Sequence, residues 1–217
     1  MPSNDIDHSP VGGIPWLHWA REIQALAQTG HFYAHNDFDR GRAEQLLTIA
    51  AEMVASHSDM SPDEVLTAFT AQPGYVTPKV DVRGVVFRQD EILMVREALD
   101  GAWTFPGGWA DVGETPRQAA EREVFEEAGL HVRAIRLIGV YDANRVEEAM
   151  SVFHAYKLVF QCEALSGELA TSSETSEVAF FPITCLPEPL SAFRTTPRHI
   201  TDALAAHRDP SRPTVFD

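Results

Sequence analysis

The residues best suited to chemistry in this chain are carboxylates crowded into one short stretch. The stretch GGWADVGETPRQAAEREVFEEAGL runs from Gly107 to Leu130, and four of its glutamates fall within seven consecutive residues. Like charges three or four residues apart on a helix destabilise it by about 0.2–0.5 kcal/mol per pair. Carboxylate oxygens gathered in this way are the ligands that hard divalent cations such as Mg²⁺ prefer. The stretch therefore indicates a metal-binding site rather than an ordinary solvated face.

The same stretch carries the start and stop signals of a helix. Thr115 opens a T-P-x-Q capping box with the proline at the first helical position, and Gly129 supplies the stop. At about 100° per residue, Ala120, Val124 and Ala128 form a narrow apolar stripe. We expect the helix to pack against the rest of the protein along this stripe.

Three glutamates lie beside the apolar stripe. Glu123, Glu126 and Glu127 occupy an arc of about 100° on the helix surface. Arg122 is the basic residue near this arc, whereas Glu121 lies outside it and is interpreted as an ordinary surface residue. The pattern places three carboxylates on one face of the helix, next to the core.

The loop ahead of the helix is rich in glycine. Gly107, Gly108 and Gly113 permit backbone conformations that other residues rarely adopt. We expect the loop to fold back and bring Glu114 over the acidic face, while Asp111 has no assigned role. A loop glutamate beside three helix glutamates supplies oxygen ligands that a magnesium ion can combine with water and substrate phosphate oxygens.

The spacing from Gly108 to Leu130 resembles the signature of the Nudix family. The pattern G-x5-E-x7-R-E-U-x-E-E-x-G-U, in which U is a bulky aliphatic residue, is matched at all nine specified positions. The resemblance implies a Nudix fold, an α/β/α sandwich around a mixed sheet. It also implies a pyrophosphohydrolase that uses Mg²⁺, or Mn²⁺ as a substitute, to cleave a nucleoside diphosphate linked to another moiety X. The products are a nucleoside monophosphate and phospho-X.

Carried over position by position, the resemblance assigns roles within this Nudix box. Glu123, Glu126 and Glu127 are the expected metal ligands. Arg122 is expected to hold and orient a carboxylate, either Glu114 or Glu126. In such sites the metal neutralises the diphosphate and lowers the pKa of the attacking water. Glu114, Arg122 and Glu126 are therefore the catalytic candidates within the box.

A later acidic loop supplies another candidate for the general base. The segment LATSSETSEVAFFPI carries Glu174 and Glu177 just before an aromatic-rich strand. A polar loop without a catalytic role also fits this segment. The resemblance favours Glu177 as the base or as an extra metal ligand.

Candidates for substrate binding lie outside the box. The planar fork of Arg96 suits a phosphate contact, although an exposed strand-end residue also fits this position. Tyr141 and Arg145 are candidates to line the pocket for the base or for X, and residues without such a role fit there equally well. Arg194 and Arg198, beside the last predicted helix, are interpreted as surface residues.

The chain divides into two parts by its pattern of apolar residues. Residues 15–74 predict a helical N-terminal domain, and residues 75–207 predict a β-rich domain with one central and one terminal helix. The segment QPGYVTPK, with two prolines and a glycine, links them. A flexible N-terminus (1–14) and a C-terminal tail (208–217) complete the chain. The fold class is α+β, a Nudix α/β/α sandwich with a small N-terminal all-helical domain.

Periodicity and capping residues predict the individual elements. The first two helices are expected to turn Trp19 and Leu46 inward with their other apolar residues. Asp37 or Asp39 is expected to cap the second helix, and Ser61 the third. In the β-rich domain the predicted strands and closing helix are 80–87, 91–97, 132–143, 151–165, 177–183 and 196–207.

The N-terminal part adds a second resemblance. WLHWAREIQALAQTGHFYAHNDFDRGRAEQLLTIAAEM resembles the helical N-terminal domain of one Nudix branch, whose bacterial members include CDP-choline pyrophosphatases. CDP-choline or a related CDP-alcohol is therefore the expected substrate, with ADP-ribose as the alternative. A nucleotide-sensing regulator without turnover is an alternative of another class, against which the intact box argues.

Composition limits the partners of the protein. A net charge of −15 repels nucleic-acid backbones, which argues against DNA and RNA and favours a small-molecule substrate. No apolar run is long enough to cross a membrane, and the N-terminus lacks the features of a signal peptide. Cys162 and Cys185 fit reduced thiols of a cytoplasmic protein. We expect a homodimer, partly because so small a helical domain needs an apolar partner. Either the β-rich domain of the same chain or a second subunit fits that need.

Overall fold

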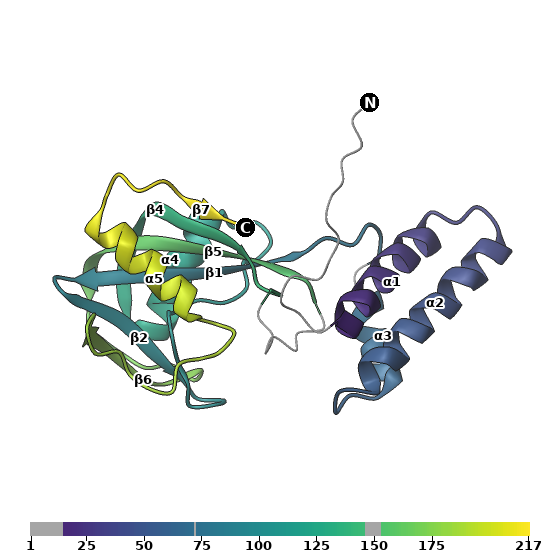
Figure 1. Cartoon of the computed structure of the whole chain (residues 1–217), viewed down its shortest axis with the longest axis horizontal. Helices are drawn as coiled ribbons and strands as arrows, with labels where there is room; N and C mark the ends of the chain where they lie inside the picture. Colours follow the sequence, from purple (N-terminus) through teal and green to yellow (C-terminus); the bar gives the residue numbers. More distant parts are fainter. Residues whose placement is uncertain (1–14, 72, 146–152) are drawn as a thin grey trace. The chain divides into compact units, whose positions relative to one another are not determined.

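The computed structural model describes residues 15–71, 73–145 and 153–217. The chain separates into two compact units (Figure 1). The helical unit contains Met1–Pro78 and Asn144–His154, and the sheet unit contains Lys79–Ala143 and Ala155–Asp217. The predicted flexible N-terminus, 1–14, lies outside the described residues.

The helical unit is built from α1 (Pro15–Phe32), α2 (Asp37–Ala55) and α3 (Pro62–Thr70). The capping box predicted at Ser61 is present, with Glu64 as its second member. The prediction for α2 was wrong, because its N-cap is Asn36 rather than either aspartate. Asn36 has the extended backbone that a cap requires, with φ −145° and ψ 162°, and its side chain accepts from the Asp39 backbone N–H.

Two apolar residues predicted to face inward on these helices are exposed. Trp19 is 51% exposed and Leu46 is 44% exposed. Trp19 follows the buried Leu17 by two residues, about 200° around the helix, so it lies on the opposite side. The core of this unit is formed instead by a set of smaller side chains together with Leu17 and Phe69: Ala20, Ala50, Ala51, Val54 and Val65.

The sheet unit is a mixed sheet with two helices. Its elements in chain order are β1 (Lys79–Arg88), β2 (Glu91–Glu97), β3 (Trp103–Thr104), α4 (Pro116–Ala128), β4 (Leu130–Asp142), β5 (Ala155–Gly167), β6 (Thr175–Pro182), α5 (Pro197–Arg208) and β7 (Val215–Phe216). The strand order is β3-β2-β1-β5-β4-β7, and β6 pairs with β2. With the helical unit, this gives the α+β class that the sequence predicted.

The two helices cover opposite faces of the sheet (Figure 1). Side chains alternate along β1, so Val85 packs in the core that contains α5, while Val86 packs in the core that contains α4. Gly84 lies under α4, where a Cβ would stand 2.3 Å from the Val124 side chain. Helix α4, which carries the glutamates of the box, therefore rests directly on β1.

Strand β1 holds the start of the box at its edge. It pairs in parallel with β5, from Lys79 opposite Ala155 onward. On its other edge, the Val82 backbone N–H donates to the Gly108 carbonyl at 2.8 Å, and the Gly84 N–H donates to the Pro106 carbonyl at 2.9 Å. The residues that open the box are thus laid along the central strand.

The described residues contain no helix with the length and apolarity of a membrane span. Cys162 is buried, Cys185 is exposed, and both are free cysteines.

Candidate active site

The box helix α4 has the ends predicted from its sequence. Thr115 is the N-cap, with Gln118 completing the capping box and a proline in the first turn. Gly129 ends the helix in the left-handed conformation, at φ 74°, and its N–H donates to the Phe125 carbonyl. These local signals fix where the acidic face begins and ends.

The glutamates of α4 differ in burial. Glu123 and Glu127 are 8% and 4% exposed, next to the fully buried Val124. The side chain of Glu126 is 54% exposed. The predicted acidic arc therefore comprises two buried carboxylates and one at the surface.

The interpretation of Glu121 as an ordinary surface residue was wrong. Its Oε1 accepts from the Ala134 backbone N–H at 2.8 Å. Ala134 lies in β4, so Glu121 attaches the box helix to the neighbouring strand. Helical periodicity could not reveal this contact because it depends on where β4 passes.

Arg122 connects the acids of the box. Its Nε donates to Glu114 Oε1 at 2.9 Å, and its Nη2 donates to Oε2 of the same residue at 3.0 Å. Its Nη1 donates to Glu123 Oε1 at 2.8 Å and to Glu126 Oε2 at 2.9 Å. The fold-back of Glu114 and the bracing contacts of Arg122 are both present as predicted. The catalytic roles given to these residues stay predictions.

The glycine pair at the start of the box lies against the two buried carboxylates. The Gly107 N–H donates to Glu127 Oε2 at 2.9 Å. A Cβ on Gly107, which has φ 149°, would stand 2.0 Å from the Val82 carbonyl oxygen. A Cβ on Gly108 would stand 3.0 Å from Glu123 Oε1. Only a residue without a side chain fits at the first position, because the backbone passes too close.

Burial makes the two inner carboxylates hard to ionise. It raises the pKa of Glu127 to about 8, against the opposing effects of Arg83 and of the Gly107 N–H. Burial also raises the pKa of Glu123, and the contact with Arg122 opposes this. A divalent cation beside them would favour their charged forms.

The donor set fits such a cation. In the described residues no three histidine, cysteine or acidic side chains are arranged as a ready-made metal group. However, Mg²⁺ is usually held by one or two carboxylates, with water and substrate phosphate supplying its other ligands. Glu123 and Glu127 provide two buried carboxylates one helical turn apart, and Glu126 provides a third at the surface.

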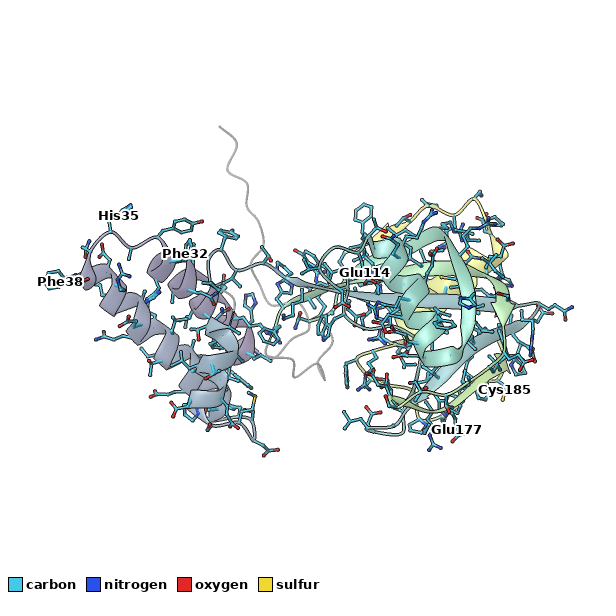
Figure 2. The ribbon with its side chains drawn as sticks, turned by 180° about the vertical axis from the view of Figure 1, so that it is seen from behind. Phe32, His35, Phe38, Glu114, Glu177 and Cys185 are labelled. Carbon is cyan, nitrogen blue, oxygen red and sulfur yellow. The ribbon has the colours of Figure 1, made fainter. Side chains whose placement is uncertain are left out.

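The structure brings Arg96 and Glu177 together. The Arg96 Nη1 donates to Glu177 Oε1 at 2.5 Å, and its Nε donates to the Gly101 carbonyl at 2.8 Å. Both belong to the β2–β6 pair, and Figure 2 shows Glu177 and Glu114 on separate parts of the sheet unit. Arg96, which was predicted to contact a substrate phosphate, and Glu177, which was predicted to be the general base, therefore contact each other.

The two other candidates for substrate binding have different surroundings. Tyr141 is 2% exposed, its hydroxyl donates to Asp202 at 3.2 Å, and its ring packs edge-on against His199 at 4.6 Å. It is a core residue in this structure. Arg145 is exposed and lies next to 146–152, outside the described residues. Their contact with a substrate remains a prediction.

Sequence reasoning missed several charged residues around the site. Asp81, Arg83 and Lys157 are buried on β1 and β5 at 7%, 4% and 3% exposure. Glu97 is 9% exposed, and burial raises its pKa. The available signal was VDVRGVVF, a strand otherwise made of core residues that carries two charges on the same face.

Arg194 is not the surface residue that the sequence suggested. Its side chain is 15% exposed, and its Nη1 donates to Asp100 Oδ2 at 2.6 Å. Its Nε lies 3.4 Å from Glu97 Oε1. The loop before α5 therefore contributes a charge to the buried set. Arg198, by contrast, has a side chain that is 53% exposed.

Comparison with known proteins agrees with both parts of the sequence interpretation. Residues 77–204 match the family model of the NUDIX domain. Residues 15–69 match the model described as "UDP-X-like, N-terminal oligomerisation domain".

Two similar proteins match nearly the whole chain, and a third matches about two thirds of it. A Bacillus subtilis (strain 168) protein named "Putative ADP-ribose pyrophosphatase YjhB" is 37% identical over 202 residues, which is 93% of this chain and 97% of that protein. The crystal structure of a UDP-X diphosphatase is 30% identical with a TM-score of 0.61, covering 94% of this chain and 98% of that chain. The crystal structure of an ADP-ribose pyrophosphatase from Streptococcus suis 89-1591 is 37% identical with a TM-score of 0.59, covering 65% of this chain and all of that chain (100%).

Proposed function

We propose a function that starts from the family: this chain belongs to the Nudix family and is a Nudix pyrophosphohydrolase. In this proposal the carboxylates of the box bind Mg²⁺, and the enzyme hydrolyses a nucleoside diphosphate linked to a small moiety X. The observation that carries this proposal is the arrangement around Arg122. One guanidinium holds Glu114, Glu123 and Glu126 on a single face, beside the buried Glu127. On such a face the guanidinium offsets part of the repulsion among the carboxylates, whose oxygens are donors that suit a divalent cation.

Each residue of the face has a distinct task in this proposal. Glu123 and Glu127, which are buried, and Glu126, which is at the surface, would hold the metal. When bound, the metal neutralises the diphosphate and lowers the pKa of the attacking water. Arg122 keeps the carboxylates apart and oriented, and Glu114 holds Arg122 through a two-pronged contact. Glu126 is our first candidate for accepting the proton of the water, with Glu177 as the second.

The catalytic assignment is tested by removing charge at the box. The double variant Glu126→Gln with Glu127→Gln should lose at least about 100-fold in kcat, because metal-binding oxygens are replaced by neutral amides. Glu163→Gln, at an exposed ion pair with Arg133, is the matched control and should leave kcat unchanged. Glu177→Gln should reduce kcat strongly if it supplies the base. Hydrolysis retained by the double variant would show that the assignment is wrong.

The identity of the base and of X is tested by a substrate panel. The sequence predicts CDP-choline or a related CDP-alcohol, whereas the names of two similar proteins support ADP-ribose, and a third supports a UDP-linked compound. Measuring nucleoside monophosphate release from each compound at equal concentration decides among them. A kcat/KM for CDP-choline below that for ADP-ribose would reject the CDP-alcohol prediction.

We also propose that the helical unit joins two copies of the chain into a homodimer. The matched family model is described as an oligomerisation domain. On α1, Trp19 and Leu26 are 51% and 74% exposed, and they lie seven residues apart on one stripe. On α2, Leu46 and Ile49 are also exposed, at 44% and 47%. Phe32 and Phe38 add two aromatic rings near the turn between α1 and α2 (Figure 2). Exposed apolar side chains at this density fit an interface between protein chains.

A further inference from the structure

A buried cluster of charges lies on the face of β1 opposite α4. We call Asp81, Arg83 and Lys157 the Asp81 cluster. Arg83 Nε and Nη2 donate to the two Asp81 oxygens at 3.0 and 2.8 Å, and Lys157 Nζ lies 3.7 Å from Oδ1. Burial opposes the charge of Asp81, but Arg83 and Lys157 outweigh it and lower its pKa. Buried ion pairs often stabilise a fold no more than apolar residues of the same volume would, so this cluster calls for another explanation.

The Asp81 cluster reaches the segment that opens the box. Arg83 Nη1 donates to the Phe105 carbonyl at 3.3 Å. The backbone of β1 holds the next residues, through the bonds to Pro106 and Gly108 described above. One edge of the Arg83 guanidinium is thus held by Asp81, and its Nη1 holds the carbonyl of Phe105, two residues before Gly107.

The same segment is held from its other side by the loop before α5. The Phe105 N–H donates to Thr195 Oγ1 at 2.9 Å, and both residues are fully buried. Lys157 Nζ donates to the Phe193 and Arg194 carbonyls at 2.9 and 2.6 Å, which fixes that loop. Lys157 therefore holds the two residues just before Thr195, and Thr195 in turn holds Phe105.

What these contacts fix is the place of two carboxylates. The Gly107 N–H holds Glu127, and Gly108 lies so close to Glu123 that even a methyl group would touch its carboxylate. A shift of Phe105 would move both glycines, because they follow it directly along β1. The buried carboxylates would then lose their positions relative to each other.

We propose that the Asp81 cluster positions Glu123 and Glu127 for metal binding by locking the Phe105–Gly108 segment against β1. Arg83 is the positioning residue, and Asp81, which also pairs with Lys157, balances its charge and orients it. Thr195 holds Phe105 from the opposite side of the segment. The inference rests on the proposed function, because it takes these glutamates as metal ligands.

The test is Arg83→Lys, which keeps the buried positive charge but cannot contact Asp81 and Phe105 at once. We expect a folded protein whose kcat falls by about 10-fold with KM changed less than about 2-fold, and whose Mn²⁺ affinity falls by about 10-fold. Mn²⁺ binding is measured by water-proton relaxation without substrate. Arg88→Lys is the matched control on the same strand, because Arg88 also contacts a carboxylate through Nε and Nη2, on the exposed Glu91. It should leave kcat and Mn²⁺ affinity unchanged.

A second variant covers the case in which Arg83→Lys does not fold. Thr195→Val keeps the shape but removes the acceptor of the Phe105 N–H, and we expect the same losses of kcat and Mn²⁺ affinity. A folded Arg83→Lys or Thr195→Val with unchanged Mn²⁺ affinity and kcat would overturn the proposal. If neither variant folds, the cluster is a requirement of the fold, and a separate positioning role is likewise rejected. A wild type that binds Mn²⁺ but turns over no substrate would reject the proposed function while the binding measurements still decide this inference.

Discussion

Arg122 makes the acidic face of the box compatible with a folded protein. It contacts Glu114, Glu123 and Glu126 at hydrogen-bonding distance, and the bond to Glu114 is the main cause of its raised pKa. The repulsion among the glutamates is therefore balanced within the box. The balance depends on the planar fork, since each of its edges meets a different carboxylate.

Replacing Arg122 with lysine tests whether charge alone is enough. Arg122→Lys keeps the positive charge, but a single ammonium cannot span Glu114 on one edge and Glu123 on the other. We expect kcat to fall by about 10- to 100-fold while the free energy of unfolding falls by about 1 kcal/mol or less. Steady-state kinetics and urea denaturation give the two numbers. Arg117→Lys, at an exposed site on the same helix, should change neither. Full activity in Arg122→Lys would mean that the fork has no special role.

His199 makes stability depend on pH. Burial lowers its pKa to about 3, and the neighbouring Lys157 and Arg83 act in the same direction, while Asp81 opposes them. Between about pH 3 and 6.5 the unfolded chain binds a proton at this imidazole and the folded chain does not. The contribution of the neutral His199 to the free energy of unfolding is therefore complete above about pH 6.5, and it is lost as the pH falls through this window.

The variant His199→Gln should remove this pH dependence. His199 Nδ1 accepts from the Thr196 N–H in the capping box of α5, and Gln118 fills the equivalent position in α4. Glutamine should therefore retain the cap without titrating. Between pH 7 and pH 5 we expect the wild type to lose about 2 kcal/mol more unfolding free energy than the variant. Equal losses, measured by urea denaturation at both pH values, would contradict a neutral buried imidazole.

The helices could be predicted from the sequence because their end signals are local. Contacts between residues far apart in the sequence could not be predicted. The caps of α3 and α4 depend on residues within three positions of each other, so Ser61 and Thr115 were recognised. The box face was predicted for the same reason. Asp81 and Lys157 were missed because they meet only when β1 pairs with β5, which periodicity does not encode. The α2 cap was missed because three polar residues within four positions, Asn36, Asp37 and Asp39, were all chemically suited to the position.

The end of α4 depends on a close backbone approach. A Cβ on Gly129 would stand 2.4 Å from the Glu168 carbonyl oxygen, whereas a Cβ on Gly113 meets nothing within 4 Å. Both residues have positive φ, 74° and 99°. Gly113→Ala should therefore cost only backbone strain, about 1 kcal/mol, and Gly129→Ala should cost about 2 kcal/mol or more in addition. Urea denaturation of the two variants measures the difference. Equal costs would mean that the backbone near Glu168 yields freely.

The protein combines a strongly acidic composition with helices that expose several large apolar side chains. The net charge of −15 disfavours association of two copies, so an interface between them must be apolar enough to overcome repulsion. Trp19 and Leu26 on α1 provide such a surface. The charge also disfavours nucleic-acid substrates, in agreement with a small-molecule enzyme.

The dimer proposal predicts a change of mass upon substitution. Trp19→Glu with Leu26→Glu should convert the dimer to a monomer, because it puts charge into the apolar stripe of α1. Size-exclusion chromatography with light scattering measures this. Leu99→Glu is the control, since Leu99 is 87% exposed in the sheet unit and should leave the mass unchanged. A wild type that is monomeric at micromolar concentration would reject the proposal.

The parallel pairing of β1 with β5 sets an order of events when the protein is made. Lys79 lies opposite Ala155, and the whole box is encoded between them. A growing chain therefore presents its acidic helix well before Lys157 exists to complete the Asp81 cluster. Contacts between residues so far apart in sequence form slowly. During synthesis the nascent protein should carry an intact Nudix signature without a working site, and hydrolytic competence should appear only after β5 has docked.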